Sequence, residues 1–393
     1  KVRNPVKTVA NVTRHVKMRP MIKDLRDMKL LLRALACCLL FSLPATAATV
    51  VDGLYEAEVV VPDGQSPGLD SPLVGNALRS VLVKVTGQTD FSNNELALEA
   101  LAAPRNFVRE FGFHSQEVEA SEEQRLQFGI EMTTQRVMRV AFLRGAVLQL
   151  VRRSGLPLWS PNRPDVLIWL AVDDYQQTSW VTPELQPDTA NTLRQLAEQR
   201  GVPSHFPLAD FEDDFALQPS ELLARDYSRV GAASARYNHD VVVAGQAVQT
   251  SDGTWIGQWR FSLDGQLQQF DVLGANKDEF LSLGVNRVAD AIADKYAVVS
   301  DADHTSLSLR VLGLKGFAEY AAINAYLNGL TAIDKADVDL LDGDLVVFRI
   351  DLSGSLEQFE NAITLDQKMI PESQRALTQN FDLQYRWVGD FNE

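Results

Sequence analysis

The chain has 393 residues, with 37 Lys and Arg against 52 Asp and Glu, which gives a net charge of −15. A surface with this excess of negative charge repels nucleic-acid phosphates and anionic lipid, so the composition argues against an electrostatic binder of nucleic acid. The length exceeds that of a typical single domain and predicts two or three domains.

Residues 28–47 contain the three parts of a secretory signal peptide. Met28 and Lys29 form a basic start, an apolar run of about a dozen residues follows, and Ala45-Thr46-Ala47 ends the segment. That run is shorter than the roughly 20 apolar residues that a membrane span requires. We therefore predict cleavage between Ala47 and Ala48 and a mature chain without a transmembrane span. The alternatives are an uncleaved anchor and a lipoprotein.

Residues 1–27 are basic and do not begin with Met, and we interpret them as sequence upstream of a start at Met28. A long basic leader to the signal is the alternative. Both cysteines, Cys37 and Cys38, lie inside the signal, so the predicted mature chain has no disulfide and no thiol nucleophile. After residue 47 there remain 27 basic and 50 acidic residues, a net charge of −23.

Residues 48–164 are expected to form an N-terminal α+β domain. Residues 71–86 place their apolar side chains on one side of a helix that Gly87 ends, and Arg125 to Met132 alternates as a half-buried strand does. The predicted elements are a strand over 50–61, helices over 71–86 and 94–111, a strand over 125–132 and a helix from Thr133 or Thr134 to Gly155.

Residues 165–302 are expected to form a middle α/β domain, which follows a rigid connector over 155–164. Val166 to Val172 is a continuous apolar run, typical of a strand that is covered on both faces. The strongest helical periodicity runs over 277–296. The other predicted elements are helices over 191–199 and 220–235, a short strand over 202–208, a polar loop over 210–219, and strands over 240–248, 255–263 and 266–272.

Residues 303–393 follow a polar break and predict the element order of a ferredoxin-like βαββαβ domain. The expected elements are strands over 307–311, 338–341, 345–352 and 381–388, with helices over 317–329 and 356–364. The fold class that follows is a multidomain α/β and α+β protein, with small mixed sheets and helices on one face.

The acidic stretch Asp210, Glu212, Asp213 and Asp214 is the first candidate site. Paired carboxylates perform acid–base chemistry where burial separates their pKa values. Four acids in a polar loop also commonly face water, and we favour that solvated or structural role over ligand binding and catalysis.

Other chemistry has weaker support. Asp337, Asp339, Asp342 and Asp344 do not have the spacing of an EF-hand and are interpreted as a solvated hairpin turn. His114, His205, His239 and His304 are scattered and favour no zinc site. The sequence contains neither a serine-hydrolase elbow nor a nucleotide-binding loop, so no cofactor is predicted.

Trp255 and Trp259 lie on the same side of a predicted strand, and we expect at least one of them in the core. The alternative is an exposed pair that stacks on sugar or peptide.

Arg136, Arg139 and Arg144 form, with Arg152 and Arg153, the one basic concentration of the mature chain. On the predicted helix over 133–155 they would be a solvated face whose last arginines complement the helix dipole. The alternative is a docking surface for an acidic partner or for an acidic patch on another copy.

Several motifs resemble the domain-of-unknown-function family 2066, which comprises uncharacterised exported proteins of proteobacteria. They include the segment from Gly155 to Pro164, Arg200-Gly201-Val202-Pro203, and the later residues Gly253, Trp255 and Trp259. The residues that we single out from these motifs as a binding or structural set are Trp159, Arg163, Arg200, Asp210, Asp213, Arg236, Tyr237 and Asp240. The resemblance implies a Gram-negative periplasm and supplies no activity.

The middle block is also loosely similar to small α/β modules of envelope assembly proteins, which is an analogy of fold alone. We therefore expect a periplasmic, non-enzymatic binding or assembly factor with envelope proteins as partners. A hydrolase of envelope polymers that uses carboxylates of the 210–214 stretch and a small-ligand carrier are the alternatives.

Overall fold

The computed structural model describes residues 49–119, 125–126, 129, 131–175, 177–263, 265–299, 305–372 and 381–389. The predicted signal peptide with both cysteines, Ala47 and Ala48, and also His304, lie outside these residues. All the described residues belong to one compact unit, Thr46–Glu393. None of the helices described within it has the length and apolar character needed to span a membrane.

The N-terminal part is an antiparallel sheet with helices packed on one face. The strands are in the order β2-β4-β3, with β2 at Glu56–Val61, β3 at Val108–Glu119 and β4 at Met132–Phe142. The helices are α2 (Pro72–Thr86), α3 (Glu95–Ala102), the short 3-10 helix η1 (Pro104–Phe107) and α5 (Arg144–Arg153). Gly87, in the left-handed conformation, ends α2 as the sequence predicts, and Ser71 caps its start.

Three predictions for this part are wrong. The helix over 94–111 stops at Ala102, and residues 108–111 already belong to β3. The helix over 133–155 is reduced to α5, because Met132–Phe142 is the central strand of the sheet. Val137 and Met138 are consecutive and so point to opposite faces of β4, yet both are buried. The apolar positions of this strand therefore do not simply alternate, and they imitate helical spacing. Within the predicted strand 125–132, Arg125 and Leu126 are helical.

The middle part contains a mixed sheet in the order β12-β11-β10-β7-β8, with the short strand β9 also on β7. Strand β7 pairs in parallel with β10 and β9, and the remaining pairs are antiparallel. The bounds are Val166–Asp173 for β7, Thr178–Trp180 for β8, Ser204–His205 for β9, Val241–Gln249 for β10, Trp255–Leu263 for β11 and Gln266–Gly274 for β12.

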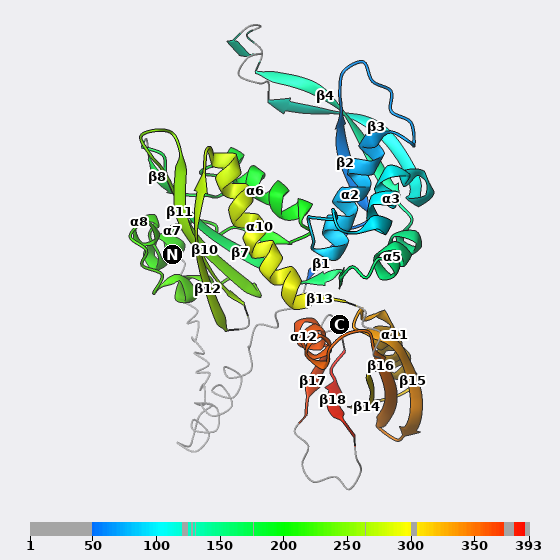
Figure 1. The fold of residues 1–393 in the computed structure, drawn as a ribbon. Coiled ribbons are helices and arrows are strands. Elements are labelled where there is room, and N and C mark those ends of the chain that lie inside the picture. Colours follow the sequence, from blue (N-terminus) through cyan, green and yellow to red (C-terminus); the bar gives the residue numbers. More distant parts are fainter. Residues whose placement is uncertain are drawn as a thin grey trace, which may run out of the picture. The chain divides into compact units, whose positions relative to one another are not determined.

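Helices cover both faces of this sheet (Figure 1). Helices α6 (Pro187–Gln199) and α10 (Lys277–Tyr296) lie on one face, over a core that includes Trp255 and Trp259. Three short helices form a second, smaller core with the opposite face: α7 (Phe211–Ala216), α8 (Pro219–Leu223) and α9 (Val230–Ser234). Two predictions are corrected here, because part of the polar loop over 210–219 is helix α7 and the single helix over 220–235 is split into α8 and α9.

The C-terminal part has the predicted βαββαβ order with one strand added. Its sheet runs β15-β16-β14-β18-β17. Strand β18 is parallel to β14, and the unpredicted β17 is antiparallel to β18, so β17 runs in the same direction as β16. The bounds are Thr305–Leu312 for β14, Phe317–Gly329 for α11, Ile333–Asp342 for β15, Leu345–Leu352 for β16, Leu356–Asp366 for α12, Met369–Pro371 for β17 and Leu383–Trp387 for β18.

Two short strand pairs involve the connector at 155–164. Strand β1 (Thr49–Val50) pairs with β6 (Asn162–Arg163), and β5 (Leu158–Trp159) pairs with β13 (Ala297–Val298). Strand pairing therefore holds the backbone of the connector at Leu158–Trp159 and again at Asn162–Arg163. The mixed α/β and α+β class is confirmed, while the division at 164 and 303 remains a prediction.

Candidate functional site

Arg163 and Arg200, two of the residues singled out from the sequence, meet at the C-terminal end of helix α2. Arg163 is fully buried, and its guanidinium donates to the carbonyl oxygens of Ser160 at 3.0 Å, Gly201 at 2.7 Å and Lys84 at 2.6 Å. The same group lies over the ring of Trp159, with 3.9 Å from Cζ to the ring centroid. The guanidinium thus binds backbone oxygens of three segments that are far apart in the sequence.

Arg200 also contacts the C-terminal end of helix α2. Its Nη2 donates to the carbonyl oxygen of Gly87 at 2.7 Å and to Asp290 at 2.6 Å, and its Nη1 donates to Oδ1 of Asn286 at 2.6 Å. Cations are stabilised at a helix C-terminus because unpaired carbonyls point there. Arg163 and Arg200 therefore join α2 to the middle sheet, which is a structural role.

Two glycines make this arrangement possible. Gly201 has a φ of +66°, and a Cβ there would collide with Nη1 of Arg163. Gly87 has a φ of +74°, and a Cβ there would collide with Ala293. Only glycine combines the left-handed backbone with this close approach.

Four more of the singled-out residues form a second cluster, at the start of helix α7. Asp210 caps the helix by accepting from the backbone N–H groups of Glu212 and Asp213, both at 3.0 Å. Arg236 binds both oxygens of Asp210, at 2.8 and 2.9 Å, and Oδ1 of Asp213 at 3.2 Å. The other Asp213 oxygen accepts from the Tyr237 hydroxyl and from the Ala209 N–H. We call Asp210, Asp213, Arg236 and Tyr237 the α7 network.

Of the two roles favoured for the acidic stretch, solvated or structural, Asp213 has the structural one, because its side chain is completely buried. Hydrogen bonds from Arg236 and from backbone N–H groups hold the pKa of Asp210 well below its usual range. Burial, followed by the hydrogen bond to Asp213, raises the pKa of Tyr237 to about 12. A general base needs a free oxygen within reach of the proton it removes. Here both carboxylates are occupied by fixed donors, and Tyr237 keeps its proton.

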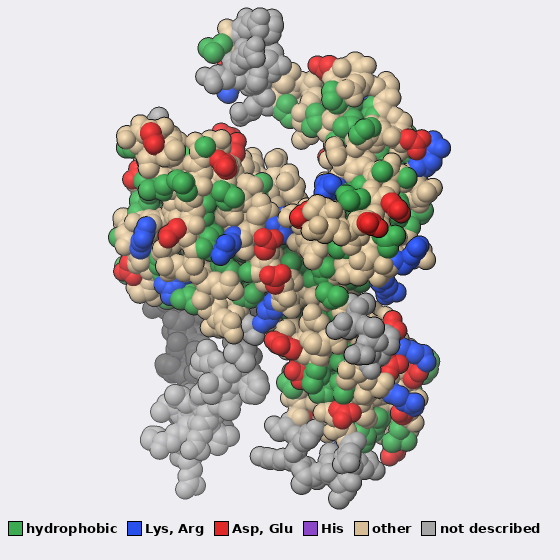
Figure 2. Space-filling model, in the orientation of Figure 1, with side chains coloured by type: hydrophobic (Ala, Val, Ile, Leu, Met, Phe, Trp, Pro, Cys, Tyr) green, Lys and Arg blue, Asp and Glu red, His purple; other side chains and the backbone are tan. Residues whose placement is uncertain are grey.

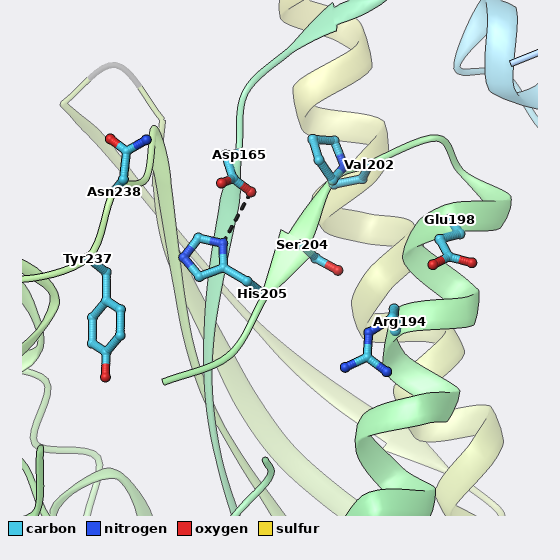
Figure 3. Close-up of a pocket in the computed structure, with 9 residues that line it drawn as sticks. Asp165, Arg194, Glu198, Val202, Ser204, His205, Tyr237 and Asn238 are labelled. Atoms are coloured by element: carbon cyan, nitrogen blue, oxygen red, sulfur yellow. Dashed lines mark hydrogen bonds and ion pairs between the residues drawn. The ribbon is translucent and has the colours of Figure 1, made fainter. Parts of the chain in front are cut away.

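A pocket of about 560 Å³ lies next to this network (Figure 3). His205 on β9 binds Asp165 through Nδ1 at 3.1 Å, while Tyr237 borders the pocket on one side and Arg194 and Glu198 of α6 border it on the other. The pocket lies at the amino ends of the parallel strands β7, β9 and β10. Ligands of open α/β sheets bind beyond the carboxyl ends of such strands, so this position does not favour a substrate site.

Asp240 also acts within the structure. Its carboxylate accepts the backbone N–H of Asp165 at 2.9 Å, and this contact joins the starts of β10 and β7. Burial, as the largest cause, raises its pKa. Among the described residues, no group of three or more His, Cys, Asp or Glu is placed to hold a metal ion.

The arginines expected on one helix face lie in different environments. Arg136 and Arg139 are on β4, three residues apart, so they point to opposite faces of the sheet. Arg139 is paired with Glu56, Arg136 lies 4.1 Å above the ring of Phe113, and Arg144 lies over Tyr55. On the face drawn in Figure 2, Lys and Arg side chains are scattered among acidic ones. The three arginines do not share one docking surface on a helix, and their role toward a partner stays a prediction.

Sequence reasoning missed Phe211 and Phe215. Both belong to α7, and both face solvent, with exposed fractions of 88% and 79%. A signal was present, since two aromatics four residues apart follow an Asp in a capping position. The acidic residues between them favoured the interpretation as a loop.

In a comparison with protein families, residues 48–160 match the family model of a domain of unknown function, DUF8605. This finding corrects the resemblance to family 2066, which is wrong, because the matching family is a different one. The match covers the N-terminal sheet and its helices and does not include the α7 network.

Comparison with curated proteins gives no match. Among solved structures, a selenomethionine-substituted allophanate hydrolase of Kluyveromyces lactis is similar at 9% identity and a TM-score of 0.15. The similarity covers 64% of this chain and 62% of the hydrolase chain, which is less than two thirds of the hydrolase's length. A TM-score this low carries no argument about fold or activity.

Proposed function

We propose that the mature chain is an exported, non-enzymatic binding or assembly factor that works in the periplasm as part of the cell envelope. The observation that carries the proposal is the α7 network. The carboxylates best suited by sequence to acid–base chemistry have their oxygens taken by Arg236, Tyr237 and backbone N–H groups. The network is arranged to hold a surface helix in place, as a binding surface requires. The predicted signal peptide at 28–47 supports export from the cytoplasm.

The first test asks whether the protein turns over an envelope polymer. Residues 48–393 and the Asp210→Asn variant are incubated with peptidoglycan, and released fragments are measured by chromatography. We expect no release from either protein. Asn caps a helix as well as Asp does, so the variant keeps its fold. Release by the native chain that is lost in the variant would replace the proposal with a hydrolase.

The second test asks for a partner. Residues 48–393 are crosslinked in an envelope extract, and the products are identified by mass spectrometry. We expect one reproducible envelope protein in a fixed stoichiometry. The absence of any such protein in crosslinking experiments of sufficient depth would contradict the proposal.

A further inference from the structure

In helix α7 the usual arrangement of buried apolar and exposed charged side chains is reversed. A surface helix normally turns its apolar stripe toward the core and its charges toward water. In α7 the one buried residue is Asp213, while Phe211 and Phe215 are among the most exposed apolar side chains of the described chain. The helix therefore displays two aromatic rings, one turn apart, on the outside of the molecule.

This orientation is fixed at both ends of the helix. At the start, Asp210 caps the first turn and Asp213 is anchored by Arg236, Tyr237 and the Ala209 N–H. At the end, Arg229 donates to the carbonyl oxygen of Phe215 at 2.6 Å. Leu217, directly after the helix, is fully buried in the smaller core of the middle sheet. The exposure of the two rings thus follows from a set of specific contacts.

The surroundings of the rings indicate what they could bind. Leu208, just before the helix, adds a third exposed apolar side chain. Glu212, whose carboxylate lies 3.6 Å from Nη1 of Arg236, and Asp214 are exposed acids that lie between the two aromatics in sequence. Exposed apolar patches with a polar rim mark protein interaction sites. Acids at the rim favour a partner that carries Lys or Arg, and disfavour an anionic lipid surface.

A second copy of the chain fits this surface poorly. A twofold dimer contact pairs a patch with itself. Such a contact through α7 would bring Glu212 and Asp214 of each copy against the same acids of the other copy. A basic partner has no such repulsion.

We propose that α7, with Leu208, Phe211, Phe215, Glu212 and Asp214, is a docking surface for an amphipathic helix of a partner protein that carries apolar side chains flanked by Lys or Arg. This inference rests on the proposed function, because it names the surface and the partner chemistry of a binding factor. Phe211 and Phe215 are four residues apart. A partner helix presents the apolar side chains of its own face at the same spacing, so the two sets can pack together.

The probe is a fluorescein-labelled 18-residue peptide of Leu and Lys in a helical amphipathic pattern, and its control is the same peptide with Glu in place of Lys. Binding to residues 48–393 is measured by fluorescence anisotropy. We expect binding of the Leu/Lys peptide and a loss of at least about tenfold in affinity for the Phe211→Ser, Phe215→Ser double variant. Glu212→Lys with Asp214→Lys should weaken binding similarly.

The matched control is Phe317→Ser, because Phe317 is 81% exposed and belongs to α11, a helix of the C-terminal part. It should change the affinity by less than about twofold. Equal binding by native chain and double variant would overturn the inference, since the attraction would then come from the acidic surface in general. A dimer in sedimentation experiments that dissociates in the double variant would also overturn it, in favour of a second copy.

The two proposals fail in different ways. If an envelope partner is found and the double variant still crosslinks to it, the surface is wrong and the proposed function stands. If peptidoglycan is cleaved in an Asp210-dependent manner, the proposed function fails whatever the peptide does.

Discussion

Arginine side chains hold both the end of helix α2 and the start of helix α7, but Arg163 and Arg200 are buried whereas Arg236 is exposed, and they bind different oxygens. At α2, Arg163 and Arg200 bind backbone carbonyls from several segments, and Arg163 binds only carbonyls in the contacts described above. At α7, Arg236 binds two carboxylates that lie three residues apart. The first cluster joins parts of the fold that are distant in sequence, and the second positions one short helix.

The difference shows two structural roles of an arginine guanidinium. A guanidinium on a helix C-terminus is stabilised by several partial charges, and removing it leaves all of those carbonyls without a donor. The ion pair between Arg236 and Asp210 is exposed, and removing one charge of an exposed pair costs less than removing a buried guanidinium. We therefore expect the α2 cluster to control the stability of the whole chain and the α7 network to control one surface.

The largest expected effect is at Arg163. Arg163→Met should lower the free energy of unfolding by about 3–5 kcal/mol, because three backbone carbonyls lose their donor inside the protein. Urea unfolding followed by tryptophan fluorescence measures the change, since Trp159 lies against the guanidinium. Arg163→Lys should be nearly as costly, because one ammonium cannot replace the planar fork. The control is Arg152→Met, which changes an exposed arginine of α5. If Arg152→Met lowered the free energy of unfolding as much as Arg163→Met, the contrast between the two clusters would be wrong.

The next effect is at Asp213. Asp213→Asn keeps the shape of the side chain and removes its charge, and we expect a loss of about 1.5–3 kcal/mol, the range for hydrogen bonds that involve a charged group. The exposed neighbour Asp214→Asn should change stability by less than about 0.5 kcal/mol. Both are measured by urea unfolding at pH 7. If Asp213→Asn were as neutral as Asp214→Asn, the α7 network would not anchor the helix.

The acid dependence of stability separates the clusters further. The pKa of Asp210 is lower in the folded chain than its unfolded value near 3.8. The folded state therefore binds fewer protons, and the contribution of Asp210 is present at neutral pH and is lost as pH falls below about 4. The difference in unfolding free energy between the native chain and Asp210→Asn should shrink from pH 6 to pH 3. A difference that is constant over this range would exclude a role for the Asp210 charge. Asp240, whose pKa is raised, is present in both proteins, so its contribution to the difference in unfolding free energy cancels.

Elements with a strong local pattern could be predicted from the sequence. Helices α2, α10 and α11 and strand β16 have clear periodicity or clear end signals, and the structure confirms them at the predicted positions. Strand β4 could not be identified, because Val137 and Met138 are both buried although they point to opposite faces, so its apolar residues do not alternate as in a half-buried strand. The strand β17 is three residues long and depends on its pairing with β18 for its existence.

The candidate site divides in the same way. The sequence singled out Arg163, Arg200, Asp210, Asp213, Arg236 and Tyr237 but could not show that they form two clusters, because contacts between residues separated by more than 20 positions depend on the tertiary fold. It also could not predict α7, whose inner side is a carboxylate. Periodicity identifies a helix by its buried apolar stripe, and α7 buries none.

The smallest expected effect is at Phe211 and Phe215, and it tests whether their rings stabilise the fold. Side chains that contribute to a core destabilise a protein when they are removed, whereas exposed ones change little. Phe211→Ser with Phe215→Ser should therefore change the unfolding free energy by less than about 0.5 kcal/mol per site. Leu217→Ala, two residues beyond Phe215 and fully buried, should cost about 2–5 kcal/mol. Urea unfolding of both proteins measures the contrast. A large loss in the double serine variant would mean that the rings stabilise the fold, and their exposure would then no longer indicate a docking surface.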